Sequence, residues 1–175
     1  MSESELYRSY HAPRYQDFPD LELYMDQVIS VLNKLLLPVS EEKAVLTSTM
    51  INNYVKQEIL PPPKNKRYDR RHLALLFMIC HLKRIMQLSD VSALLGRMVE
   101  ESGVEGAYEA FRAEIVPAME KTVKNTYKKE TAAVLRQSAQ AFAQLCAARR
   151  AFLDLNSQEA PEEKKEKKKA KDSEK

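Results

Sequence analysis

The residues with the most evident chemistry in this 175-residue chain are amides and cations between positions 49 and 71. A helix predicted over 49–57 has apolar residues on one side, and Thr49, Asn52, Asn53 and Lys56 on the other. An asparagine on an exposed helix can bond N6 and N7 of an adenine in the major groove of DNA. We therefore predict Asn52, Asn53 and Thr49 as base-reading residues. An ordinary solvated helix face would have the same composition.

Cations follow directly on this stretch. Residues 39–90 carry nine Lys or Arg and five Asp or Glu, a net charge of 9 − 5 = +4, whereas the whole chain carries +3. A local basic excess is expected where a protein binds a polyanion, although a solvated loop with surplus lysines gives the same count. The residues predicted to contact phosphates are Lys56, Lys64, Lys66, Arg67, Tyr68, Arg70 and Arg71.

The composition favours an all-α protein and argues against catalysis. The chain has only three Gly and no Trp, with 44% hydrophobic and 30% charged residues, which disfavours glycine-rich phosphate loops and most nucleotide-binding α/β folds. No Ser-His-Asp set or carboxylate pair is evident, so we expect no enzymatic activity and no cofactor. His72, His81 and Cys80 have no third ligand at metal spacing, and a structural role is expected for them instead of a metal site.

Apolar periodicity locates the predicted helices. We expect an N-terminal helix at about 20–37, whose apolar stripe includes Leu21 and Tyr24, and a short helix over 41–46 capped by Ser40. After the helix over 49–57, three prolines at 61–63 predict an exposed extended loop.

The second half of the chain continues the helical pattern. Asp69 should cap a long helix that contains the apolar run 73–80. The next helix, capped by Ser89, should end at Gly103 or Gly106. Two further helices are expected over 107–128, with a kink at Pro117, and over 129–155.

Residues 46–95 resemble the DNA-binding domain of the MerR regulators. Thr47–Tyr54 is similar to the start of the recognition helix in that family, Ile59–Pro61 to its hydrophobic exit, and Lys66–Tyr68 to the wing. With Leu21 and Tyr24–Gln27 upstream, the whole chain also resembles a small bacterial family catalogued as a MerR-like domain of unknown function (1836).

The resemblance implies a MerR-like winged helix-turn-helix with an N-terminal helix and a C-terminal helical pair. The expected organisation is an N-terminal extension (1–17), the N-terminal helix segment (18–38), the winged helix-turn-helix (39–103), the helical pair (104–156) and a disordered charged tail (157–175). The sequence has neither a signal-peptide core nor an apolar stretch of membrane-spanning length, so we expect a cytoplasmic protein that does not enter a membrane.

The favoured hypothesis is a sequence-specific DNA-binding transcriptional regulator that acts as a homodimer on double-stranded DNA. The helix near 49–57 would read the major groove, and the wing near 61–71 would grip phosphates. The helices at 107–128 and 129–155 would offer the dimer surface, a role that the N-terminal helix could instead share. An unidentified small-molecule effector, bound among the N-terminal helix and the C-terminal pair, is compatible with this hypothesis.

The alternative is a helical protein-interaction adaptor that keeps the winged fold without binding DNA. It is favoured by three departures from the MerR pattern. Asn52 and Asn53 stand where that family usually has Arg and Tyr, Glu58 replaces the usual helix-ending Gly, and the wing is short.

Overall fold

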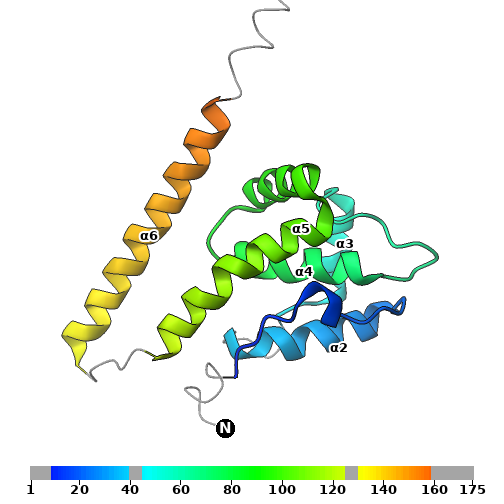
Figure 1. The fold of residues 1–175 in the computed structure, drawn as a ribbon, viewed down its shortest axis with the longest axis horizontal. Coiled ribbons are helices and arrows are strands. Elements are labelled where there is room, and N and C mark those ends of the chain that lie inside the picture. The colour runs from blue at the N-terminus through cyan, green and yellow to red at the C-terminus, as the bar shows by residue number, and fades with distance from the viewer. Residues whose placement is uncertain (1–8, 40–44, 125–129, 159–175) are drawn as a thin grey trace, which may run out of the picture. The chain divides into compact units, whose positions relative to one another are not determined.

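The computed structural model describes residues 9–39, 45–124 and 130–158. All regular elements in these ranges are helices, which confirms the all-α prediction (Figure 1). They are the 3-10 turns η1 (Tyr15–Asp17) and η2 (Leu37–Val39) and the helices α2 (Met25–Leu36), α3 (Ser48–Lys56), α4 (Arg70–Leu82), α5 (Leu88–Lys124) and α6 (Thr131–Gln158). The predicted short helix over 41–46 and the predicted tail over 157–175 fall largely outside the described residues.

The chain divides into two compact units, Met1–Thr126 and Tyr127–Lys175. The first unit contains α2 to α5, and the second contains α6. No helix in the described ranges is both long enough and apolar enough to span a membrane.

Helix α4 forms the centre of the first unit, where it packs against both α2 and α5 (Figure 1). As predicted, Asp69 caps this helix, because its side chain accepts a hydrogen bond from the backbone N–H of His72 at 3.2 Å. Every residue of the apolar run Leu73–Cys80 is buried, in agreement with the prediction. A helix that is apolar on all sides must be surrounded by other elements, and α4 takes this position.

Aromatic side chains connect the N-terminal segment, residues 13–18, to α4 and α5. The ring of Phe18 lies 6.2 Å from that of Phe77 and 5.2 Å from that of Tyr108, in edge-on arrangements. Tyr108 is fully buried, and its hydroxyl donates to the carbonyl of Pro13 at 2.8 Å. Residues 13–18 are therefore an integral part of the core.

The start of α2 differs from the sequence prediction, whereas the break in α5 agrees with it. Helix α2 begins at Met25 and not near residue 20, because Leu23 is extended and exchanges two backbone hydrogen bonds with Tyr68, at 2.8 and 2.9 Å. Leu21, which was assigned to the buried stripe, is 74% exposed. The break in α5 falls at Gly103, one of the two glycines predicted to end a helix, and its φ of 70° lies in the left-handed region. Pro117, where a kink was expected, lies inside the helix that continues to Lys124.

His81 should make the stability of the protein dependent on pH. Its Nδ1 donates to the carbonyl of Phe77 at 2.8 Å, and its Nε2 accepts from the hydroxyl of Tyr10 at 3.1 Å. Burial lowers the pKa of His81 below its ordinary value of 6.5, so the folded state favours the neutral ring. This contribution to stability is present above pH 6.5 and is lost as the pH falls below that value, because the unfolded chain binds the proton more readily.

Urea unfolding at pH 7 and pH 5.5 measures this effect. The parent should lose stability between the two values, whereas His81→Phe, which keeps an aromatic ring in the cluster, should show a smaller loss. An equal loss in the two proteins would contradict the role of His81. His11→Gln, which changes an exposed histidine, is the matched control.

Candidate nucleic-acid interface

Helix α3 places the predicted base-reading residues at the surface. Ile51 and Tyr54 are buried, at 0% and 4% exposure, and hold one side of the helix against the core. Thr49, Asn52, Asn53 and Lys56 follow one another at steps of three, one and three residues and are all exposed. The predicted polar stripe is thus one continuous, solvent-facing side of α3.

The start of α3 is fixed by two polar side chains. Thr47 caps the helix by accepting a hydrogen bond from the N–H of Met50 at 3.3 Å. Just before it, Asn33 of α2 accepts from the N–H groups of Val45 and Leu46, at 3.0 and 2.9 Å, and donates to the carbonyl of Leu46 at 3.0 Å. Helix α2 therefore positions the backbone that leads into α3.

Replacing Asn33 with alanine should loosen α3. The change removes the partners of two backbone N–H groups and one carbonyl, and because these groups are only part-buried we expect a loss of about 1 kcal/mol in the free energy of unfolding. Hydrogen exchange of the amides in Ser48–Lys56 should accelerate more than that in α4. Unchanged exchange in α3 would show that Asn33 does not position it. Lys34→Ala, at the exposed neighbouring residue, is the control.

The loop after α3 has left-handed residues at its start and at its tip. Glu58 has a φ of 59° at the position where a helix commonly ends in glycine. Near the tip, Asn65 and Lys66 have φ values of 52° and 61°, and the N–H of Arg67 donates to the carbonyl of Lys64 at 2.9 Å. These angles are those of a tight type I′ turn.

This loop does not contain the strands of a wing. Its described residues form only isolated antiparallel bridges, between Lys64 and Arg67 and between Tyr68 and Leu23. The prolines at 61–63 lack N–H groups, so the bridge at the tip cannot extend into a ladder on that side. The predicted wing is therefore a loop with a tight turn.

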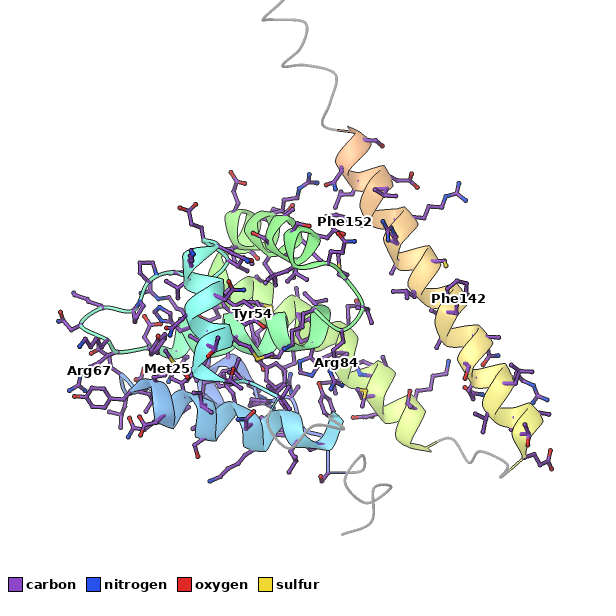
Figure 2. The ribbon with its side chains drawn as sticks, turned by 180° about the vertical axis from the view of Figure 1, so that it is seen from behind. Met25, Tyr54, Arg67, Arg84, Phe142 and Phe152 are labelled. Carbon is purple, nitrogen blue, oxygen red and sulfur yellow. The ribbon has the colours of Figure 1, made fainter. Side chains whose placement is uncertain are left out.

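Three predicted phosphate contacts are available on the loop. Lys64 and Lys66 are exposed on the turn. Arg67, which is labelled in Figure 2, is anchored by Tyr24. Its guanidinium carbon lies 4.4 Å from the centre of the Tyr24 ring, and its Nη2 donates to the Tyr24 hydroxyl at 2.8 Å. The sequence did not indicate this role for Tyr24, because the helical pattern assigned it to an apolar stripe. In the structure Tyr24 is 49% exposed, so its ring is accessible to Arg67.

Two other residues predicted to contact phosphates, Tyr68 and Arg70, make contacts within the protein instead. Tyr68 is 3% exposed, and its ring packs edge-on against His72. Arg70 donates from Nε to the carbonyl of Phe18 at 3.1 Å and pairs with Asp20 at 3.2 Å. The structure therefore does not bring these residues to the surface formed by α3 and the turn.

Arg71 is exposed, but its charge is offset. Its Nε and Nη2 donate to one oxygen of Asp69 at 2.9 and 2.7 Å. Burial opposes ionisation of Asp69, but hydrogen bonds from Arg71 and His72 outweigh it and lower the pKa of the carboxyl to about 2. Among the predicted phosphate contacts, the cations that make no ion pair with a described residue are Lys56, Lys64, Lys66 and Arg67.

Asn53 of the polar stripe and the two histidines of α4, His72 and His81, also make hydrogen bonds within the protein. Gln57, which the sequence analysis did not single out, donates to the side-chain oxygen of Asn53 at 3.3 Å, and this exposed bond can exchange for an external partner. His72 bonds Asp69 through Nδ1, and His81 bonds Tyr10 and Phe77, in keeping with the structural roles expected for them.

A known protein family matches most of the first compact unit. A family described as a domain of unknown function (DUF1836) matches residues 13–111. The chain belongs to this family. The DUF1836 match begins at Pro13, whose carbonyl accepts from Tyr108, and it includes every residue of the α3 stripe and of the loop. Helix α6 lies outside the match. No curated protein and no solved structure matches the chain.

Proposed function

We propose that this protein is a cytoplasmic, sequence-specific DNA-binding transcriptional regulator. Helix α3 would enter the major groove, which is about 12 Å wide and admits one helix. Asn52, Asn53 and Thr49 would contact base edges. The loop would act as the short wing of a MerR-like winged helix-turn-helix.

One observation carries this proposal. Thr49, Asn52, Asn53 and Lys56 form an exposed, uniformly hydrogen-bonding side of α3, while the opposite side is anchored by Ile51 and Tyr54. A helix held by its apolar side and presenting amides outward has the geometry that direct readout requires.

The cations near α3 support the same function. Lys56 ends the polar stripe, and Lys64 and Lys66 lie on the loop that follows, together with Arg67, which is labelled in Figure 2. Such residues contact phosphates and set the register of a protein on DNA without reading its sequence. The type I′ turn holds two lysines at the loop tip, and the Tyr24 ring orients Arg67.

Helix α6 supports a dimer. Several of its large apolar side chains are exposed, among them Leu135 at 70% and Phe142 at 68%, which are seven residues apart. Apolar residues at this spacing favour association with a second helix, and a two-fold dimer would double the number of base pairs that are read. We propose α6 of a second copy as this partner.

The variant Lys66→Ala tests the phosphate-contact part of the proposal. It should weaken binding to every duplex and lower the slope of log affinity against log salt by about 0.9, because one fewer counterion is released. Fluorescence anisotropy across a salt series measures the slope. Lys34→Ala, on the exposed side of α2, is the control and should leave the slope unchanged. Equal slopes for the parent and Lys66→Ala would remove Lys66 from the interface.

The exposed apolar residues of α6 also support an alternative, a protein-interaction adaptor that does not bind DNA. One measurement distinguishes the two functions. An adaptor should show no binding to a random duplex at low salt with micromolar protein, whereas a regulator should bind because non-specific affinity is electrostatic.

A further inference from the structure

Two neighbouring pockets lie beside the loop in the first compact unit. One has a volume of about 330 Å³ and is mainly apolar, with Val55 and Ile59 on one side and Leu95 and Val99 of α5 on the other. The second has a volume of about 310 Å³ and is lined by charged residues, among them Lys64, Arg67 and Arg71. Each volume is at the lower end of the range for small-molecule sites.

The pockets share a wall. Pro61, Pro62, Leu75 and Val104 line both of them. The two pockets are therefore adjacent, and a single ligand that spans the shared residues would place one part in the apolar pocket and another in the charged pocket.

We propose that the two pockets together bind one small amphipathic anion, with an aromatic or aliphatic body in the apolar pocket and a carboxylate or sulfonate group in the charged one. The site differs from the one expected from the sequence, since it lies beside the loop and not among the N-terminal helix and the C-terminal pair.

The charges favour this orientation of the ligand. The charged pocket has three cations, Lys64, Arg67 and Arg71, and two carboxylates, Glu22 and Asp69, a balance of 3 − 2 = +1. Glu58 lines the apolar pocket and would repel an anionic group placed there. The anionic group is therefore directed toward Lys64 and Arg67.

A buried nitrogen gives a second reason to expect a ligand in the charged pocket. His72 lines this pocket and is 6% exposed, and its Nε2 has no hydrogen-bond partner among the described residues. A buried polar atom without a partner is unfavourable, and polar groups of a ligand can supply one. Lys64 likewise makes no ion pair with another described residue.

The apolar pocket has room for the body of the ligand at Gly96. A side-chain carbon built at this glycine meets no atom within 4 Å, although the residue lines the pocket. Ser92 lines the same pocket one helical turn earlier. A larger side chain at either position can fill the pocket without displacing the core.

The proposed site overlaps the proposed DNA contacts. Lys64 and Arg67 line the charged pocket and are also predicted phosphate contacts. If the proposed function holds, a bound anion would neutralise these residues and weaken DNA binding. This consequence alone rests on the proposed function.

The 175-residue chain can be tested without DNA by titration with 8-anilinonaphthalene-1-sulfonate, an amphipathic aromatic anion that fluoresces when bound. The parent should show saturable binding with one probe per chain. Gly96→Leu should weaken binding about tenfold by filling the apolar pocket, and Ser92→Leu should act in the same direction. Leucine is a better helix former than glycine, so Gly96→Leu should remain folded, as circular dichroism would verify.

Lys64→Met should also weaken binding about tenfold, because it removes a charge-assisted contact with the sulfonate. Lys56→Met is the matched control, since Lys56 lies on α3 and lines neither pocket. N-phenyl-1-naphthylamine, which has the same body without the sulfonate, should bind Lys64→Met and the parent alike.

Two results would overturn the proposal. If Gly96→Leu and Ser92→Leu bind the probe as the parent does, the apolar pocket is not the site. If Lys64→Met and Lys56→Met have equal affinities, the charged pocket does not hold the anion. Neither result depends on DNA binding, so failure of this site is distinguishable from failure of the proposed function.

Discussion

Replacing Phe77 with alanine should lower the free energy of unfolding by about 3–5 kcal/mol, the usual cost of removing a fully buried phenylalanine. Phe77 is 0% exposed, and its ring centre lies 4.4 Å from that of His81, 5.9 Å from Tyr108 and 6.4 Å from Phe111. The substitution leaves a cavity between α4 and α5 and also removes the contact with Phe18. The loss would be a large part of the total stability of an ordinary domain.

Urea unfolding at low temperature measures this loss. Phe77→Leu, which retains most of the buried volume, should cost much less and serves as the control. A loss below about 1 kcal/mol in Phe77→Ala would contradict the close packing of α4 against the N-terminal segment and α5.

Asn53→Ala should reduce affinity for the cognate DNA site by about 1–3 kcal/mol, which corresponds to a factor of roughly 5 to 150. Asn53 is exposed in the middle of the α3 stripe, where its amide can pair with an adenine in the major groove after releasing Gln57. The cognate site would first be selected from a library of random duplexes and then titrated with the parent and the variant.

The expected loss of affinity in Asn53→Ala depends on the DNA sequence. Affinity for a random duplex should remain nearly unchanged, because a neutral amide contributes little to the electrostatic binding that such duplexes measure. Gln140→Ala on α6 removes an exposed amide outside the interface and should have no effect on either duplex. Equal affinities of the parent and Asn53→Ala for the cognate site would exclude Asn53 from base readout.

Local patterns predicted most of the helices. The alternation of apolar and polar residues predicted both sides of α3, and Asp69 ahead of an apolar run predicted the start and the burial of α4. The φ of Gly103 matches the predicted helix break. These features depend on neighbouring residues, so a single sequence contains the information for them.

Contacts between distant residues could not be predicted in this way. Leu23 pairs with Tyr68, which delays the start of α2 and buries a residue that was expected to face phosphates. Arg70 is bound to Phe18 and Asp20, some fifty positions earlier in the chain. Charge and residue type indicated cations near the loop, but only the fold shows which of them remain exposed.

The central claim is that the surface formed by the α3 stripe and the loop binds duplex DNA. Anisotropy of a labelled random duplex at low salt tests it most directly, with the parent compared with the charge-reversed variant Lys56→Glu/Lys66→Glu. We predict micromolar binding by the parent that weakens as salt is added, and loss of that binding in the variant. Absence of binding by the parent at micromolar concentration, or equal binding by the two proteins, would contradict the claim.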